Sequence, residues 1–486
     1  MSGMDEREYD VVVVGAGPVG ENVVDRVRAA GLSVAVVEER LVGGECSYFA
    51  CVPSKALLRP VLAAAATGRV RGLTPARVDP PGVFARRDWW TGGGDDSAQV
   101  DWLASTGAEL IRGHARLDGP RRVVVETDAA ADEAGPAGPA GARVALVARH
   151  AVVLATGSSP ALPPIDGLAA ARPWTNRQAT NASTVPRRLA VLGGGVVGAE
   201  MATAYAGLGA KVTVLARGPR LLGRMEPFAG ELVADGLREA GVDVRLRTTV
   251  TAVHRQADGT VTVSTDGGET VRADQVLAAL GRRPNTATLG VDTVGLKPGE
   301  SVEVDDSLRA TGVEDGWLYA TGDVNGRNLL THMGKYQARA AADVIVARAT
   351  GKPDDAAGMR AGSDAGAVTQ VIFTDPEVAA VGPTLEQARE QAGADGRVRA
   401  VDVEMSAASG AGLQADGYRG KARLVLDEDR RVVLGATFVG QDVAELLHAA
   451  TIAVVGQVPL DALWQAVPAF PTMSEVWLRL LESAGL

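Results

Sequence analysis

One structural pattern occurs twice in this chain, and the repeat limits the possible folds more than any other feature. Residues 11–14 form a short apolar run, followed by Gly-Ala-Gly-Pro-Val-Gly, a helix-like stretch and a second apolar run that ends at Glu38. Residues 189–192 precede Gly-Gly-Gly-Val-Val-Gly, another helix-like stretch and the apolar run 212–215. Each copy predicts a strand, a tight glycine turn, a helix and a strand, the unit of a Rossmann-like nucleotide-binding domain.

The first glycine turn has the residues that a dinucleotide requires. Gly15 permits the tight turn, Gly17 lets the backbone approach a pyrophosphate, and Gly20 lets the helix pack closely on the strand. The free N–H groups and the dipole at the helix N-terminus favour phosphate there. Glu38 ends the next strand, where its carboxylate can accept hydrogen bonds from ribose hydroxyls. We expect a nucleotide site here.

The second glycine turn, formed by Gly193, Gly195 and Gly198, differs at one informative position. The residue that corresponds to Glu38 is Ala216, so no carboxylate would repel a 2′-phosphate. Three arginines follow within one or two turns: Arg217, Arg220 and Arg224. Because guanidinium groups bind phosphate bidentately, this pattern favours NADPH, with NADH still possible. The alternative interpretation is that these arginines form a solvated surface.

The only two cysteines of the chain, Cys46 and Cys51, lie directly after the first nucleotide unit. A close pair of thiols in a reducing compartment is typical of redox or metal chemistry. On a regular helix their axial separation would be about 7.5 Å, longer than the Cα spacing of about 4.4 to 6.8 Å that a disulfide accepts. The helix must therefore be distorted between them. Without a second Cys or His pair at ligand spacing, no metal site is expected.

Composition excludes several classes of protein. The 486 residues suggest about three domains, and a net charge of −10 with a pI near 5.2 opposes binding to a nucleic acid backbone. The first ten residues are polar, and the apolar runs are shorter than the roughly 20 residues of a membrane helix. We expect a cytoplasmic protein without a membrane or nucleic acid partner.

Beyond the second nucleotide unit the pattern changes. Apolar strand-like runs at 368–373, 422–426 and 432–439 are followed by a helix from about Val443. The absence of another glycine turn predicts a separate α+β domain. Residues 127–142 are rich in Ala, Gly, Pro and Asp and lack periodicity, which predicts a surface loop between strands.

Together these motifs resemble the pyridine nucleotide-disulfide oxidoreductase family over nearly the whole chain. The resemblance rests on the two glycine turns and on the Cys-x4-Cys-Val-Pro-Ser-Lys segment. Further family-like motifs are Ala-Thr-Gly at 155–157, Gly-Arg-Arg-Pro-Asn at 281–285 and Ala-Thr-Gly-Asp at 320–323. The implied fold is α/β, with two Rossmann-like dinucleotide-binding domains and an α+β C-terminal dimerisation domain.

The resemblance also implies domain boundaries, cofactors and an assembly. The FAD-binding domain would comprise 1–158 and 281–352, the NAD(P)H-binding domain 159–280, and the dimerisation domain 353–486. The protein would be a homodimer that binds FAD and NADPH and acts on a small molecule.

Individual residues acquire expected roles from the same resemblance. Cys51 would lie against the flavin as the charge-transfer thiolate, and Cys46 would be the interchange thiol that faces substrate. Lys55 and Glu200 would pair near the flavin, while Asp323 would bond the ribityl chain. Further cofactor contacts are implied for Gly44, Thr156, Gly157 and Gly281.

The C-terminal motif departs from the family pattern. Members typically carry His-Pro-Thr-x-Ser-Glu, in which His, oriented by Glu, moves protons for the interchange thiol. This chain has Phe470 in place of that His and keeps Glu475, and its five histidines lie elsewhere. Because a positioned acid or base contributes roughly 10²- to 10⁴-fold, ordinary disulfide turnover should be poor unless water, Tyr48 or another group substitutes. Alternatively, Phe470 excludes protons, as in a carboxylase-type relative.

Three functional hypotheses follow. The leading one is an FAD-dependent NAD(P)H oxidoreductase that passes electrons through the Cys46–Cys51 disulfide to a small disulfide or thiol-reactive substrate. The second is an NAD(P)H:quinone-type reductase in which flavin reduces the acceptor directly. The third is a non-catalytic redox sensor that binds a protein partner.

Overall fold

The computed structural model describes residues 4–127, 142–393 and 396–486, and the chain divides into two compact units. Unit 1 comprises Met1–Val52, Asp88–Pro160 and Arg282–Asp364. Unit 2 comprises Pro53–Arg87, Ala161–Gly281 and Ala365–Leu486. The three-domain division expected from the sequence stays a prediction, and all but the two ends of the predicted loop at 127–142 lie outside the described residues.

A seven-stranded sheet in the order β3-β2-β1-β6-β5-β4, with β16 paired to β6, forms the centre of unit 1. β3, β2, β1, β6 and β16 pair in parallel, whereas β5 is antiparallel to its neighbours β6 and β4. Its strands are β1 (Asp5–Val14), β2 (Val34–Glu38), β3 (Glu109–Arg112), β4 (His114–Leu117), β5 (Arg122–Glu126), β6 (Arg143–Leu154) and β16 (Leu318–Ala320). The apolar end of β1 is buried, as expected for a parallel strand covered on both faces.

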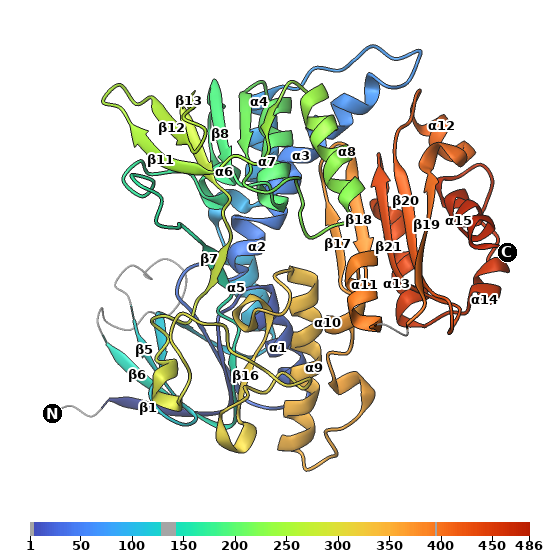
Figure 1. Ribbon diagram of the computed structural model, residues 1–486. Helices are drawn as coiled ribbons and strands as arrows, with labels where there is room; N and C mark the ends of the chain where they lie inside the picture. The colour runs from blue at the N-terminus through green and yellow to red at the C-terminus, as the bar shows by residue number, and fades with distance from the viewer. Residues whose placement is uncertain (1–3, 128–141, 394–395) are drawn as a thin grey trace. The chain divides into compact units, whose positions relative to one another are not determined.

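Two helices, α1 (Pro18–Ala29) and α9 (Thr331–Ala349), lie side by side in unit 1 (Figure 1). Val23 and Val27 of α1 and Ala338 of α9 are fully buried in one cluster with β1. The position of Pro18 at the start of α1 is favourable, because the missing N–H would have no helical partner there. The predicted strand, glycine turn, helix and strand are therefore all present.

Unit 2 contains the second glycine unit and a separate antiparallel sheet. The parallel sheet has the order β10-β9-β8-β14, and a three-stranded antiparallel sheet has the order β11-β12-β13. These strands are β8 (Arg188–Leu192), β9 (Lys211–Leu215), β10 (Asp243–Arg245), β11 (Val250–Arg255), β12 (Val261–Thr265), β13 (Thr270–Ala273) and β14 (Gln275–Ala278). The helix after the glycine turn, α7 (Val196–Gly207), is buried along most of its length.

The C-terminal part of unit 2 is an antiparallel sheet with helices, as the sequence predicted. Its strands have the order β17-β18-β21-β20-β19. They are β17 (Thr369–Ile372), β18 (Glu377–Val381), β19 (Val398–Glu404), β20 (Lys421–Asp427) and β21 (Val432–Gly440). The helix expected from Val443 starts with a 3-10 turn, and its α-helical part is α13 (Leu447–Val455).

The remaining elements connect these sheets. Two short strands, β7 (Ser158–Pro160) and β15 (Arg282–Pro284), pair antiparallel in unit 1. The other helices are α2 (Gly44–Tyr48), α3 (Cys51–Thr67), α4 (Pro80–Trp90), α5 (Ser97–Ser105), α6 (Asn176–Asn181), α8 (Pro227–Glu239), α10 (Ser363–Gly366), α11 (Leu385–Ala392), α12 (Ser409–Gln414), α14 (Leu460–Trp464) and α15 (Val476–Ala484).

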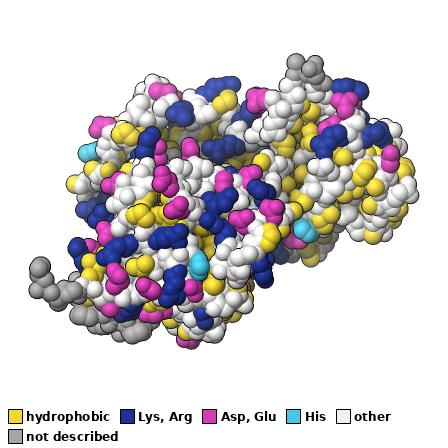
Figure 2. All heavy atoms as spheres, turned by 90° about the horizontal axis from the view of Figure 1, so that it is seen from below, with side chains coloured by type: hydrophobic (Ala, Val, Ile, Leu, Met, Phe, Trp, Pro, Cys, Tyr) yellow, Lys and Arg dark blue, Asp and Glu magenta, His cyan; other side chains and the backbone are white. Residues whose placement is uncertain are grey.

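The segment Gly44–Thr67, which comprises α2 and α3, has the length and apolar composition that could cross a membrane, among the residues that the structure describes. Buried core helices share this length and composition. Leu57 and Leu58 of this stretch are buried in the apolar cluster of unit 2. On the face drawn in Figure 2, basic side chains are interspersed with acidic ones.

We predict that Gly20→Ala severely destabilises unit 1. A Cβ atom at this position would overlap the carbonyl oxygen of Gly15, because α1 packs directly on the turn that precedes it. The free energy of unfolding should fall by roughly 3 kcal/mol or more, at the upper end of single-substitution effects. Gly358→Ala is the matched control, since Gly358 is exposed and nothing lies near its added Cβ. Equal thermal unfolding curves for the two variants would contradict the prediction.

We also predict a pH-dependent stabilisation by Glu377→Gln. Burial raises the pKa of Glu377 to about 7, above the unfolded value of about 4.3. The native protein therefore binds more protons than the unfolded chain between these values, and its stability falls as pH rises through them. The substitution should increase the free energy of unfolding by roughly 1 to 3 kcal/mol at pH values above the folded pKa. The increase should be smaller at acidic pH.

The measurement for Glu377→Gln is the midpoint of thermal unfolding at several pH values. Glu390→Gln is the control, because Glu390 is exposed on α11 in the same unit. A midpoint difference that does not change with pH would argue against a raised pKa of Glu377 in the folded protein.

Candidate functional site

Close backbone packing shapes the first glycine turn. Gly15 has a φ of 102°, and a Cβ there would lie 2.5 Å from the carbonyl oxygen of Ala155. Gly20 packs on the Gly15 carbonyl, so α1 lies directly against the turn. The second turn repeats this geometry, with Gly193 at a φ of 114° and Gly198 packed on its carbonyl. Both turns therefore adopt the conformation that the sequence predicted.

The cysteine segment is packed on the first glycine turn. The N–H of Gly43 donates to the carbonyl of Ala16 at 2.8 Å. A Cβ on Gly44 would lie only 2.8 Å from the Cα of Gly17. Gly44 begins α2, which carries Cys46, so the backbone contact of two glycines places the first thiol beside the N-terminus of α1.

The helix is interrupted between the two cysteines. Helix α2 ends at Tyr48, and Phe49 at its C-cap has a φ of −133°. Cys51 is the first residue of α3, so no regular helix spans the pair, as the sequence argument required. The two cysteines are not joined by a disulfide, and both are half-buried.

The two thiols interact directly with each other. Their shared hydrogen bond is the largest cause that raises the pKa of Cys46, and burial adds to it. A hydrogen bond to Thr331 and the positive charge of Lys335 act in the opposite direction. The Sγ of Cys51 lies 3.4 Å from the Oγ1 of Thr331. These contacts favour a proton on Cys46 while Cys51 carries the negative charge.

Glu38 ends β2 and is turned toward the glycine turn. Its carboxylate accepts hydrogen bonds from the N–H groups of Ala16 and Arg40, each at 2.8 Å. Burial raises the pKa of Glu38, and these two hydrogen bonds oppose the rise. The carboxylate is therefore in the position that the motif predicted, with lone pairs left for a ribose.

Lys55 and Glu200 form an ion pair within unit 2. The Nζ of Lys55 lies 2.8 Å from Oε2 of Glu200. The Glu200 side chain is 5% exposed and also accepts the N–H of Phe373 at 3.1 Å. The ammonium lies 4.9 Å from the centroid of the Phe373 ring, within cation–π range. The pairing that the family resemblance implied is present, although its relation to flavin stays a prediction.

Asp323 belongs to a polar group in unit 1. It lies in the 3-10 turn Gly322–Asn325 and accepts a hydrogen bond from the hydroxyl of Ser158. Arg282 contacts Ser158 at 2.6 Å, and its guanidinium also lies 3.6 Å from Asp323 and 3.5 Å from Glu45. Neither Ser158 nor Arg282 was singled out from the sequence.

The other predicted flavin contacts lie at chain reversals. The side chain of Asn285 donates to the carbonyl of Thr156 at 2.8 Å, and the N–H of Asn285 donates to the carbonyl of Gly157 at 3.1 Å. Gly157 and Gly281 both have positive φ angles, and nothing lies near an added Cβ at either position. Gly195 in the second turn has the same open space.

The predicted arginines follow β9 in unit 2. Ala216 is buried at the end of this strand, in the position of the missing carboxylate. Arg217 and Arg224 are exposed, whereas Arg220 is half-buried. The Nε of Arg220 is buried and has no hydrogen-bond partner among the described residues. This cationic group therefore has hydrogen-bonding capacity left for an anion.

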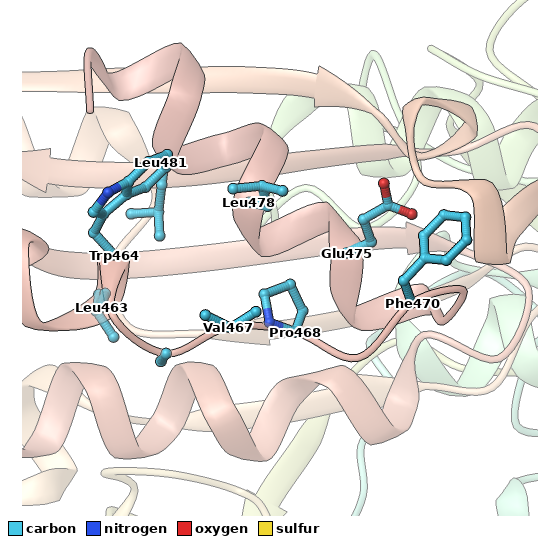
Figure 3. Close-up of a pocket in the computed structure, with 9 residues that line it drawn as sticks. Leu463, Trp464, Val467, Pro468, Phe470, Glu475, Leu478 and Leu481 are labelled. Atoms are coloured by element: carbon cyan, nitrogen blue, oxygen red, sulfur yellow. The ribbon is translucent and has the colours of Figure 1, made fainter.

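Phe470 and Glu475 lie at one end of an apolar pocket of about 120 Å³ (Figure 3). The Phe470 ring is 74% exposed, whereas Glu475 is buried. Glu475 accepts the N–H of Ser409 at 3.0 Å and a guanidinium hydrogen bond from Arg479 at 2.8 Å. The pocket is lined by Leu463, Trp464, Ala466, Val467, Pro468, Phe470, Glu475, Leu478 and Leu481.

The residues of unit 1 fit a bound FAD. Gly17 and Gly44 face each other where any Cβ would narrow the space at the N-terminus of α1. The N-cap Gly17 offers no side-chain bond to the first turn, so the N–H groups there remain available to a pyrophosphate. Glu38 would supply the ribose acceptor. Among the described residues, no group of three or more His, Cys, Asp or Glu side chains is placed to hold a metal.

Sequence reasoning missed Lys335, whose positive charge lowers the pKa of Cys46, and Glu21, a largely buried carboxylate on which Lys335 also acts. Glu21 directly follows the third glycine of the first turn, and Lys335 follows Thr331 by one helical turn. The position of Glu21 directly after the glycine motif was a usable signal. Lys335 offered none, because its approach to Cys46 depends on how α9 packs.

Comparison with known proteins gives a consistent result. Residues 9–348 match the family model described as pyridine nucleotide-disulphide oxidoreductase, and residues 368–480 match the dimerisation domain of the same family. The chain is 32% identical to a mercuric reductase of Streptomyces lividans, with 96% of this chain and 94% of the relative covered. It is 31% identical to a dihydrolipoyl dehydrogenase of Haloferax volcanii, with 98% and 96% covered.

A solved structure confirms the fold. The HOCl-induced flavoprotein disulfide reductase RclA from Escherichia coli superimposes with a TM-score of 0.82 at 24% identity, over 98% of this chain and 99% of the other. The expected α/β fold with a C-terminal dimerisation domain is thereby confirmed. The chain belongs to the pyridine nucleotide-disulphide oxidoreductases, a family of FAD-dependent enzymes with a redox disulfide.

Proposed function

We propose that this protein is an NADPH-dependent enzyme that transfers an electron pair through Cys51 and Cys46 to a small disulfide or thiol-reactive substrate. The observation that carries the proposal is the position of the two thiols on either side of the break between α2 and α3, where Cys51 is the largest influence on the pKa of Cys46. A pair held this way can alternate between a disulfide and a dithiol with little movement of the backbone. It also lies against the nucleotide turn through Gly17 and Gly44.

The two thiols have different roles in this proposal. Reduction of the disulfide takes up two electrons and one proton, and leaves a thiolate on Cys51 and a thiol on Cys46. The hydroxyl of Thr331 at 3.4 Å from Cys51 can stabilise that thiolate. Cys46 then loses its proton and attacks one sulfur of the substrate disulfide, whose other half leaves as a thiolate and takes up a proton. Cys51 next attacks Cys46 in the mixed disulfide, which releases the second half as a thiolate and restores the Cys46–Cys51 disulfide.

FAD, when bound, supplies the two-electron relay between nicotinamide and the thiol pair. Gly15, Gly17, Gly20 and Glu38 would hold its adenosine diphosphate half by the fit described above. Asp323 would bind the ribityl chain while Ser158 fixes its orientation. The Lys55–Glu200 pair would hold a positive charge next to the ring system, which favours an anionic reduced flavin.

NADPH is the proposed hydride donor. Ala216 replaces the carboxylate that would repel a 2′-phosphate, and the Nε of Arg220 is buried without a partner among the described residues. Arg217 and Arg224 are exposed nearby in the sequence. A phosphate would supply charge-assisted hydrogen bonds to these groups. NADH remains a possible, weaker donor.

A cytoplasmic homodimer is the proposed assembly, with domains at 1–158 and 281–352, 159–280 and 353–486. The family dimerisation domain at 368–480 supports this assembly. Exposed apolar side chains in that region support it as well, since such surface is usually covered by a partner. They are Leu413, Ile452, Val455, Trp464, Val467 and Phe470.

A second candidate is a carboxylase-type reaction in which the enzyme keeps protons away from a carbanion. The exposed ring of Phe470 at the apolar pocket favours this candidate, because the ring carries no exchangeable proton. The retained, buried carboxylate of Glu475 argues against the carboxylase-type reaction. In this structure that carboxylate already accepts hydrogen bonds from Arg479 and from the N–H of Ser409. A panel of disulfides, quinones and thiol-conjugated ketones separates the candidates.

We predict that the oxidised protein takes up roughly two hydride equivalents per chain in an anaerobic NADPH titration, one for flavin and one for the disulfide. A long-wavelength band from thiolate beside flavin should accompany the uptake. Cys46→Ser should abolish the second equivalent and lower disulfide reduction by roughly 10³-fold or more, because the attacking sulfur is gone.

Ser47→Ala is the control for Cys46→Ser, since Ser47 is the next residue of α2 and is also half-buried. Uptake of a single equivalent by the unaltered protein, without the band, would refute the cysteine relay. Quinone reduction that survives in Cys46→Ser would instead support direct transfer from flavin.

We predict that Arg217→Ala with Arg220→Ala raises the KM for NADPH by about 10- to 100-fold, because two charge-assisted hydrogen bonds to the 2′-phosphate are lost. The KM for NADH should change by less than about threefold. Steady-state kinetics with both nucleotides is the measurement. Arg272→Ala is the control, since Arg272 is an exposed arginine of β13 in the same unit. Equal changes for both nucleotides would exclude a 2′-phosphate site.

A further inference from the structure

The short turn that carries Asp323 is held by a buried amide side chain. This 3-10 turn, Gly322–Asn325, lies between β16 and α9. Its first residue, Gly322, has a positive φ of 78° and no side chain that could fix it. The contacts that hold the turn must therefore come from elsewhere, and the side chain that supplies them is Gln337 on α9, which is fully buried.

Gln337 contacts the turn on both sides of Asp323. Its Oε1 atom accepts hydrogen bonds from the N–H of Gly322 and from the Nδ2 of Asn325, each at 2.8 Å. The side chain of Asn325 is itself buried. One oxygen atom thus fixes the residue before Asp323 and the last residue of the turn. Between these two fixed points, Asp323 accepts the hydrogen bond from the hydroxyl of Ser158.

Asp364 fixes the orientation of the Gln337 amide. The Nε2 of Gln337 donates to Oδ2 of Asp364 at 2.9 Å. An ionised carboxylate can only accept hydrogen bonds, so the NH2 end of the amide faces Asp364 and its oxygen faces the turn. Arg327 lies 3.5 Å from the same carboxylate oxygen, and its charge favours the ionised form. The orientation of Gln337 is therefore set by a charged partner.

Close packing holds the other side of the turn against the start of α1. A Cβ on Gly334 of α9 would lie 2.7 Å from a methyl group of Val19 and 3.1 Å from the Cα of Gly322. A Cβ on Gly322 would also lie 3.1 Å from Val19. Such apolar contacts limit how far the turn can move but have no preferred direction. The hydrogen bonds to Gln337 are directional, so they determine how the turn is oriented.

We propose that Gln337, oriented by Asp364, is a positioning residue for FAD, and that it holds the turn in the conformation in which Asp323 meets the ribityl chain. The inference rests on the proposed function, in which Asp323 binds that chain. Gln337 would not contact the cofactor itself, because both ends of its buried amide contact the protein. Its effect should therefore appear in the ribityl contact and not in the contacts of the adenosine diphosphate half.

The test compares two ligands on the flavin-free, full-length protein. FAD contains the ribityl chain, whereas ADP contains only the half that the first glycine turn and Glu38 would hold. Gln337→Met removes all three hydrogen bonds and should raise the Kd for FAD by about 10- to 100-fold. The Kd for ADP should change by less than about threefold. Quenching of flavin fluorescence measures the first constant, and titration calorimetry measures the second.

Two substitutions of Asp364 test the inference without altering Gln337, and they also decide it if Gln337→Met fails to fold. Asp364→Asn keeps an oxygen that can accept from Gln337, and should leave the Kd for FAD within about threefold of its original value. Asp364→Leu removes that acceptor and should raise the Kd for FAD by about 10-fold, because the amide is no longer held in one orientation. Both variants lose the charge that faces Arg327, so the two differ in the acceptor.

Ile345→Ala is the matched control for a loss of stability alone. Ile345 is a buried side chain two helical turns further along α9 and has no part in the hydrogen bonds of Gln337. This variant should lower the midpoint of thermal unfolding and leave the ratio of the two Kd values unchanged. An unchanged ratio in Gln337→Met, or equal effects of Asp364→Asn and Asp364→Leu, would overturn the inference alone. Failure of the unaltered protein to bind FAD would overturn the proposed function as well.

Discussion

The structure of the redox centre depends on the contact between the backbones of Gly17 and Gly44. Because neither residue has a side chain, the cysteine segment lies directly on the turn that is shaped to hold a pyrophosphate. The hydrogen bond from Gly43 to Ala16 reinforces this contact. The proposed nucleotide site and a thiol therefore lie near one helix N-terminus, because α2 carries Cys46. Any side chain at either glycine would separate the two functions.

Electrostatics around the thiols follows from the packing of α1 on α9. Thr331 contacts Cys51, and Lys335 acts on Cys46 from the same face of α9. The two sulfurs are therefore unequal before any substrate binds, which an exchange reaction requires because one sulfur attacks and the other resolves. Burial raises the pKa of Glu21 on α1 to about 7, and the positive charge of Lys335 opposes this rise.

The C-terminal motif shows how a departure from a family pattern can leave the fold intact. Glu475 is retained, and in this chain it accepts hydrogen bonds from Arg479 and from the N–H of Ser409. Its carboxylate therefore stabilises the start of α15 without a histidine to orient. Phe470 is exposed and lines one end of an apolar pocket. Its ring can therefore contact a partner or a substrate, but it has no proton to donate.

The sequence by itself determined the two nucleotide turns, the α+β C-terminal region and the broken helix at the cysteines. These features follow from local rules: glycines that must pack without a Cβ, strand periodicity, and the axial rise between Cys46 and Cys51. Only the tertiary structure decided which distant charges approach the thiols. Lys335 lies almost three hundred residues after Cys46, and its influence arises from helix packing. Electrostatic coupling depends on distance in space and on burial, and neither quantity is encoded in a local pattern.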